Sequence, residues 1–189
     1  TAVDHLCEHC LRQSPPYAQV LAAAHYEGPL REAIHRFKYR GEVGLERPLG
    51  LLLGERFEER LRGFAPDLVV PVPLHVERLR QRSYNQALLL ARRLGRMLDL
   101  TVAEQALQRT RATDSQQRLS GRGRRANLRG AFAGSGKLAD RRVLLVDDVM
   151  TTGATVEECS RELRRCGARD VLVVVLGRSA VGVGAGSRP

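Results

Sequence analysis

Apolar positions recur at helical spacing in three parts of the chain, and short apolar runs separate these parts. The helical stripes cover residues 45–61, 87–98 and 156–166. The apolar runs are DLVVPVPL (67–74), VLLV (143–146) and DVLVVVL (170–176), which we interpret as buried strands. Continuous apolar strands that alternate with helices are typical of parallel β-α-β units whose sheet is covered on both faces. The sequence therefore predicts an α/β protein with a central, mainly parallel sheet flanked by helices.

Two adjacent aspartates, Asp147 and Asp148, directly follow the apolar run 143–146. In parallel sheets, ligands bind beyond the carboxyl ends of the strands. Neighbouring side chains of a regular strand point to opposite faces, so both carboxylates reach one ligand only where the strand stops. We therefore expect the strand to end before the aspartates and residues 149–155 to form a turn at the ligand-binding edge.

The residues after the aspartates combine hydroxyl groups with a glycine and then a helical pattern. Thr155 and Glu158 have the spacing of a capping box, which predicts a helix that begins near Thr155. The free N–H groups and the dipole of a helix N-terminus favour a phosphate there. Thr151 and Thr152 add hydroxyl donors, and Gly153 allows close approach of the backbone. Vicinal hydroxyls for the carboxylates and a phosphate for the loop together fit a ribose 5-phosphate.

Other proteins also end a strand in aspartates. Phosphoacceptor receiver domains do so, but near their start and with several β-α units still to come, whereas one clear strand follows here. A capped turn of purely structural role explains Gly153 and Thr155 and leaves the aspartates unexplained. We therefore favour the sugar-phosphate interpretation.

Several segments together resemble one family. The run VLLVDDVMTTGAT (143–155) resembles the phosphoribosyl-pyrophosphate signature of type I phosphoribosyltransferases. FKYRGE (37–42), PVPLHVERLRQRSYNQALLLA (71–91), RTRATDSQQRL (109–119) and RRANLRGAF (124–132) resemble the ComF family of competence-associated, phosphoribosyltransferase-like proteins. The resemblance covers residues 26–178. It implies the type I phosphoribosyltransferase fold, with Mg²⁺ and phosphoribosyl pyrophosphate as ligands.

The resemblance also implies roles for individual residues. Asp147 and Asp148 are expected to hold the ribose hydroxyls, and to meet Mg²⁺ directly, through water or through the substrate. The residues expected to cradle the 5-phosphate are Thr151, Thr152, Gly153, Ala154 and Thr155. Pyrophosphate is expected to meet Arg82 and the backbone of a loop formed by Val72, Pro73 and Leu74. In this fold the loop often has unusual peptide geometry.

Positive charge exceeds negative charge in this chain. Lys and Arg number 31 against 21 acids, for a formal net charge of +10, and only Lys38 and Lys137 are lysines. Such an excess marks polyanion binding or simply reflects genome base composition. Seven arginines lie from Arg109 to Arg129 with one acid. A solvated loop is the ordinary explanation, whereas the resemblance implies a lid that closes over the diphosphate, with Arg111 and Arg124 as catalytic residues.

Thr151 stands where purine-salvage relatives carry a carboxylate that acts as a base. Either the acceptor needs no such base, or another residue supplies it, or the chemistry is lost.

Two functions stay open. The first is phosphoribosyl transfer to an acceptor that the sequence does not define. The second is a non-catalytic, sensory module that supports DNA uptake and meets single-stranded DNA or the uptake machinery. The aromatic content of 4% provides few stacking platforms for bases. A homodimer is also left open.

The four cysteines form two pairs. Cys159 and Cys166 fall on a helical apolar stripe, which predicts buried thiols. Cys7 and Cys10 form CEHC, half of a zinc knuckle. The resemblance implies a four-cysteine module whose first CxxC lies upstream, so zinc is expected only in a longer chain.

The domain organisation follows from these assignments. We expect a remnant of the zinc module over residues 1–19, a phosphoribosyltransferase-like domain over 20–178 and a flexible tail over 179–189. No apolar run approaches the roughly 20 residues of a membrane span. With no secretory leader in the sequence, we expect a cytoplasmic protein without membrane insertion.

Overall fold

The computed structural model describes residues 14–111, 121–136 and 138–179, without the side chains of residues 121, 122, 124 and 125. The strands are β1 (Gln19–His25), β2 (Leu68–Pro71), β3 (Leu107–Arg109), β4 (Phe132–Gly134), β5 (Arg142–Met150) and β6 (Asp170–Arg178). The helices are α2 (Gly28–Tyr39), the 3₁₀ turn η1 (Val43–Leu45), α3 (Glu46–Phe64), α4 (Val76–Arg82), α5 (Gln86–Leu98), α6 (Gly121–Leu128) and α7 (Ala154–Arg165).

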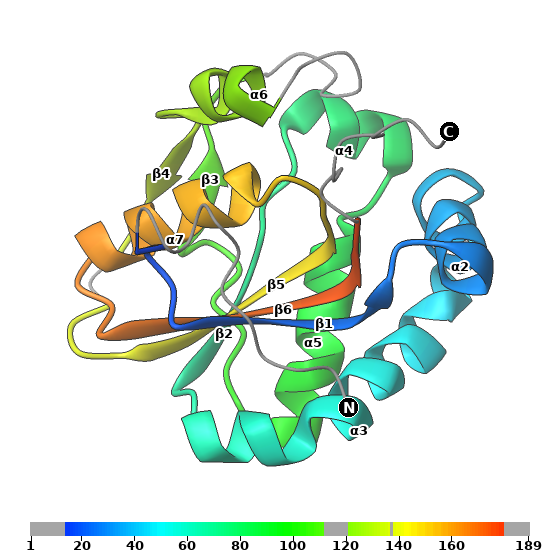
Figure 1. Cartoon of the computed structure of the whole chain (residues 1–189), viewed down its shortest axis with the longest axis horizontal. Helices are drawn as coiled ribbons and strands as arrows, with labels where there is room; N and C mark the ends of the chain where they lie inside the picture. Colours follow the sequence, from blue (N-terminus) through cyan, green and yellow to red (C-terminus); the bar gives the residue numbers. More distant parts are fainter. Residues whose placement is uncertain (1–13, 112–120, 137, 180–189) are drawn as a thin grey trace, which may run out of the picture.

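A four-stranded parallel sheet in the order β1-β6-β5-β2 forms the centre of the fold (Figure 1). Val143 and Leu145 of β5 point into a core formed with α7 and the antiparallel β3-β4 pair. Leu144 and Val146 point into a second core formed with α2, α3 and α5. The sequence-based prediction of an α/β protein with a covered parallel sheet is confirmed.

Strand β5 is longer than expected. Its parallel pairing with β6 continues through Asp147 and ends at Met150, which pairs with Arg178. On its other side, β2 ends at Pro71 opposite Val146. The expectation that the strand stops before the aspartates was therefore wrong, because β6 supports four more residues. Beyond Val146, however, none of the described strands pairs with β5 on the β2 side, and residues 147–150 line a cavity there.

The start of α7 also differs from the prediction. Gly153, in the left-handed conformation with φ 82°, is the N-cap, and the helix begins at Ala154 rather than near Thr155. The expected capping box does not form, because the Glu158 carboxylate accepts hydrogen bonds from the Gly130 N–H at 2.7 Å and from Arg161. The turn between β5 and α7 therefore comprises residues 151–153 rather than 149–155.

The two cysteines of α7 differ in burial. Cys159 is fully buried, as predicted, and both cysteines are free thiols. Cys166 is only half-buried, because it is the C-cap residue that follows the last turn. Gly167, with φ 97°, takes the left-handed conformation that ends the helix.

At the N-terminal side, Tyr17 is buried and the Ala18 N–H donates to the Val171 carbonyl at 2.8 Å, so residues just before β1 also pack on the sheet. Cys7 and Cys10 lie outside the described residues, as do residues 180–189. Within the described part of the chain, no helix is long and apolar enough to cross a membrane.

Asn85 connects the start of α5 to the loop after β2. Its side-chain oxygen accepts from the Ala87 N–H at 3.0 Å, and its amide donates to the Val72 carbonyl at 3.0 Å. We predict that Asn85→Ala lowers the free energy of unfolding by about 1–3 kcal/mol, because a cap and a second hydrogen bond are lost together. Urea denaturation measures this. Asn85→Ser keeps the cap alone and should lose about half as much, so equal losses would contradict the double role.

Candidate functional site

A cavity of about 680 Å³ opens at the carboxyl end of β5. Its walls come from the end of α2, the loop after β2, helix α4, the last residues of β5 and the turn into α7. Asp147 and Asp148, the aspartate pair, both line it. They belong to opposite faces of the strand, yet reach one cavity because β2 ends before them.

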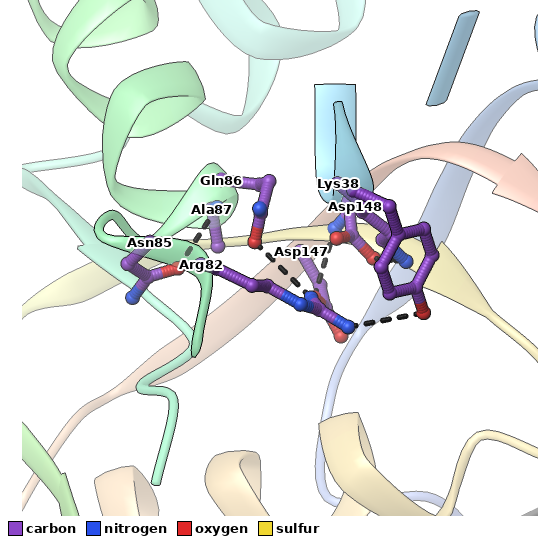
Figure 2. A network of polar contacts seen from close by, with 8 residues as sticks. Lys38, Arg82, Asn85, Gln86, Ala87, Asp147 and Asp148 are labelled. Carbon is purple, nitrogen blue, oxygen red and sulfur yellow. Dashed lines mark hydrogen bonds and ion pairs between the residues drawn. The ribbon is translucent and has the colours of Figure 1, made fainter. Parts of the chain in front are cut away.

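Asp148 forms an ion pair with Lys38 of α2 (Figure 2). The Lys38 Nζ lies 2.7 Å from the Asp148 Oδ1, and the two side chains are 14% and 12% exposed. Burial disfavours the charged lysine, but attraction by Asp148 and then Asp147 outweighs it, so the pKa of Lys38 is raised. Sequence reasoning gave Lys38 no role. The available signal was a lysine within FKYRGE in a chain that otherwise uses arginine.

Asp147 has a different environment. Its carboxylate accepts a hydrogen bond from the Asp148 N–H at 2.8 Å, and Lys38 and Arg109 lie close enough to act on it electrostatically. Burial, followed by the negative charge of Asp148, raises the pKa of Asp147 to about 7. The ligand-free site therefore holds two carboxylates with only partial compensation of their charge.

Residues 151–155, the α7 loop, line the cavity. The first backbone hydrogen bond of α7 runs from the Glu157 N–H to the Gly153 carbonyl at 2.9 Å. The N–H groups of residues 154–156 therefore have no acceptor within the helix. Such free N–H groups, together with threonine hydroxyls, are donors of the kind that can bind an anion.

Residues 72–74, the β2 loop, line the opposite wall. The Val72 N–H donates to the Val146 carbonyl at 2.9 Å, and the Val72 carbonyl accepts from Asn85. Pro73 has no N–H, so Leu74 provides the N–H donor of this loop. No cis peptide bond occurs among the described residues.

Arg82 lines the cavity and is held by two neighbours (Figure 2). It donates to the Gln86 Oε1 at 3.3 Å and to the Tyr39 hydroxyl at 3.1 Å. Its guanidinium lies 4.7 Å from the centre of the Tyr39 ring, a cation-π distance. Tyr39 is itself 57% exposed, so the Arg82 and Tyr39 pair forms part of the cavity rim.

Two further arginines on the cavity wall were missed by the sequence analysis. Arg109 lies 5.3 Å from the centre of the Phe132 ring, and Arg78 comes from α4. Burial, followed by the positive charge of Arg78, lowers the pKa of Arg109. Two cations that repel each other across a cavity favour an anionic ligand between them.

Of the two predicted catalytic arginines, the structure places the side chain of Arg111 away from the cavity. Arg111 donates to the carbonyls of Asn127 at 2.9 Å and Arg129 at 3.1 Å, at the end of α6. It is absent from the cavity wall formed by the described residues. Arg124 lies in α6, and its side chain is outside the described part of the structure.

The aspartate pair fits Mg²⁺ only in part. The described residues contain no group of three or more His, Cys, Asp and Glu side chains that could hold a metal ion. One of the two carboxylates already carries the Lys38 ammonium. Because Mg²⁺ demands a near-octahedral shell of oxygen ligands, most of that shell has to come from a ligand and from water.

Comparison with known proteins identifies the class of this chain. Residues 82–184 match the family described as "Phosphoribosyl transferase domain". "Competence protein F" of Haemophilus influenzae is 37% identical over 92% of this chain and 78% of its own length. "DNA utilization protein YhgH" of Escherichia coli K12 is 39% identical over 93% of this chain and 79% of its own length. A purine phosphoribosyltransferase structure from Pyrococcus horikoshii has a TM-score of 0.45 and 22% identity, over 72% of this chain and 76% of its own.

The fold and the family match define a phosphoribosyltransferase-like protein of the type I fold. More narrowly, the chain belongs to the ComF family of competence proteins, as its similarity to Competence protein F and YhgH over most of its length shows.

We predict that replacing the two aspartates in turn changes the free energy of unfolding in opposite directions. The folded-state pKa of Asp147 lies above its unfolded value of about 4, so its ionisation opposes folding; this penalty is fully present above pH 7 and fades as pH falls towards 4. Asp147→Asn should therefore raise the free energy of unfolding of the ligand-free protein by about 1–3 kcal/mol at pH 8 and by almost nothing near pH 4. Thermal or urea denaturation across this range measures the effect.

Asp148→Asn is the matched comparison. It leaves the largely buried Lys38 ammonium without its closest counter-ion, so it should destabilise the protein by about 2–3 kcal/mol at pH 8. If both variants shift stability in the same direction at pH 8, the description of the pair is wrong.

Proposed function

We propose that this protein binds phosphoribosyl pyrophosphate at the cavity and transfers its phosphoribosyl group to an acceptor with release of pyrophosphate. The observation that carries the proposal is the aspartate pair beside the α7 N-terminus in one cavity, in a chain of the phosphoribosyltransferase family. The acceptor stays undefined.

The cavity walls suit the three parts of this ligand. The N–H groups and hydroxyls of the α7 loop suit the 5-phosphate. Asp147 and Asp148 can accept hydrogen bonds from ribose hydroxyls. Arg78 and Arg109, with the Leu74 N–H, suit the diphosphate, because guanidinium groups bind phosphate oxygens in a bidentate manner.

In the proposed reaction, the bond between the anomeric carbon and the diphosphate oxygen breaks, and the lone pair of the acceptor forms the new bond to that carbon. The bond electrons leave with the diphosphate, and the fixed arginines stabilise this developing charge. Mg²⁺ bound to the substrate neutralises part of the diphosphate charge. Thr151 cannot act as a base, so the acceptor proton leaves to water, to another residue or from an already ionised acceptor.

A second function is supported by the names of the relatives. Proteins called "Competence protein F" and "DNA utilization protein YhgH" indicate a role in DNA uptake or use. A sensory module that binds phosphoribosyl pyrophosphate without consuming it, and meets single-stranded DNA, agrees with those names. Thr151 in place of a base is the residue that favours this alternative.

The first test is isothermal titration calorimetry with phosphoribosyl pyrophosphate, with and without Mg²⁺. We predict one site per chain, and Arg109→Met should weaken binding by about tenfold or more, because a charged hydrogen-bond donor is lost from the cavity. Arg111→Met removes an equal charge two residues away and should leave affinity within about threefold, since Arg111 holds α6. Equal losses in both variants would contradict the assigned diphosphate position.

A second test separates the enzyme from the sensor. Pyrophosphate release is measured with a panel of purine, pyrimidine and pyridine bases. If Arg111 and α6 belong to a lid that acts on the departing diphosphate, Arg111→Ala should slow turnover more than it weakens ground-state binding. Binding without consumption of the substrate by any base would exclude the transferase and favour the sensor.

The zinc proposal has its own test. We expect this chain to hold zinc weakly, because Cys7 and Cys10 supply two of the four ligands of a structural site. A longer chain with an upstream CxxC should bind one zinc and bind single-stranded DNA more tightly, with an affinity that falls as salt rises. Stoichiometric zinc in the present chain would contradict this expectation.

A further inference from the structure

Lys38 is the least expected member of the cavity wall. It reaches Asp148 from the last turn of α2, across the sheet edge, with its Nζ 2.7 Å from the Asp148 Oδ1 (Figure 2). Both side chains are largely buried, and both line the cavity. The ion pair therefore lies at the ligand-binding surface and not within the hydrophobic core.

Stabilisation of the fold is by itself a weak explanation for a buried ion pair such as Lys38 and Asp148. Replacing a buried ion pair by apolar side chains of similar volume is often neutral or stabilising, because removing two charges from water is costly. A pair retained inside a cavity therefore points to a task that its charges perform there.

That task concerns charge compensation. The aspartate pair alone presents up to two negative charges, depending on the protonation of Asp147, to a ligand whose phosphate groups are also negative. Such a site would repel its ligand unless a cation intervened. A divalent metal ion is one such cation, with carboxylate oxygens about 2.0–2.1 Å from Mg²⁺. The Lys38 ammonium already occupies the position beside the Asp148 Oδ1.

We propose that the Lys38 ammonium is a built-in cation of this site, which takes the place of a divalent ion directly bound to Asp148, so that Mg²⁺ enters only as part of the diphosphate ligand. The inference rests on the proposed function, because it states how that site compensates the charge of its ligand. The absence of a third metal-ligating side chain beside the aspartates, among the described residues, agrees with it.

The choice of a lysine at position 38 also agrees with the proposed role as a built-in cation. Among 31 Lys and Arg residues only two are lysines, and one of them is Lys38. An ammonium is a compact point charge, whereas a guanidinium is a wide planar group. A compact charge can lie beside one carboxylate oxygen and leave the Asp147 carboxylate and the cavity accessible.

The first experiment uses Mn²⁺ alone and the ligand-free protein. Electron paramagnetic resonance of free Mn²⁺ should show no stoichiometric site in the wild-type chain at sub-millimolar concentration, the range of ordinary protein-bound divalent ions. Lys38→Met removes the ammonium and should create one site, tighter than in the wild type by about tenfold or more, because both carboxylates then face the ion uncompensated. Adding Asp148→Asn to Lys38→Met should abolish that site.

Arg36→Met is the matched control. Arg36 lies on the same helix, pairs with Glu42 through an Nε to Oε1 hydrogen bond of 2.8 Å, and does not line the cavity. Its replacement by Met removes the same charge from α2 and should create no Mn²⁺ site. A site in both variants would show that net charge alone attracts the metal, which would overturn the proposal.

The second experiment measures phosphoribosyl pyrophosphate affinity in EDTA and in Mg²⁺. The affinity of the wild type in EDTA should lie within about tenfold of its affinity in Mg²⁺. In Lys38→Met, affinity in EDTA should fall by at least a further tenfold, since a charged partner has been lost, and Mg²⁺ should restore part of it. A wild type that binds the ligand only when a divalent ion is present would overturn the proposal.

The outcomes separate this inference from the proposed function. Stoichiometric Mn²⁺ binding by the wild type, lost in Asp148→Asn, overturns the role of Lys38 whatever the ligand does. A folded Lys38→Met, checked by circular dichroism, that gains no Mn²⁺ site overturns it as well. If Lys38→Met does not fold, the Mn²⁺ titration of the wild type and its ligand affinity in EDTA decide whether Lys38 replaces a divalent ion. If phosphoribosyl pyrophosphate binds under no condition, the proposed function fails, and the Mn²⁺ comparison still decides the role of Lys38.

Discussion

Two carboxylates on neighbouring residues at the end of β5 repel each other, and the rest of the site is arranged around that repulsion. Asp148 meets the ammonium of Lys38 on one face of the sheet. Asp147 lies towards the other face, where the positive charge of Arg109 acts on it, yet burial and the charge of Asp148 still raise its pKa to about 7. A ligand that donates hydroxyl hydrogens to both carboxylates relieves the part of this repulsion that the protein leaves uncompensated.

The sheet makes this arrangement accessible because its strands have unequal lengths. β2 ends at Pro71, opposite Val146, and the chain leaves the sheet through the β2 loop into α4. β5 continues to Met150 on the support of β6 alone. The resulting gap brings the β2 loop, the aspartate pair and the N-terminus of α7 around one cavity. Asn85 fixes one of these walls, the β2 loop, to the start of α5, since it caps α5 and donates to the Val72 carbonyl.

The elements that the sequence predicted are those with strong apolar patterns of their own. β2, β5, β6, α3, α5 and α7 were predicted, and the main errors concern the end of β2, which stops at Pro71 rather than at residue 74, the end of β5 and the start of α7. β1 was missed because QVLAAAH is rich in alanine and carries no strand pattern, and its parallel pairing with β6 determines its conformation. α2 was missed because it buries only Ile34 and Phe37, too few positions to establish a helical period.

The residues of the site also differ in how far the sequence alone could predict them. The aspartate pair and the α7 loop were predictable because consecutive residues carry their chemistry. Lys38, Arg78 and Arg109 come from three elements far apart in the sequence, and only the fold brings them to one wall. Within a chain of this composition, their charge alone distinguished none of them.

The excess of arginine therefore has more than one explanation. Arg92 pairs with Glu104, and Arg93 and Arg96 share Glu46, on surfaces away from the cavity. Arg93 and Glu46 are partly buried, whereas Arg92, Arg96 and Glu104 are exposed, and exposed pairs contribute little to stability. All these pairs leave little positive potential, so they agree with a compositional preference for arginine. The cavity differs, because Arg78 and Arg109 are close enough for the charge of one to lower the pKa of the other. Proximity of like charges opposes folding unless opposite charges compensate it, and here the negative charge of Asp147 acts on Arg109 in the opposite sense to Arg78. Position in the fold, rather than total charge, therefore distinguishes the arginines of the cavity wall from the others.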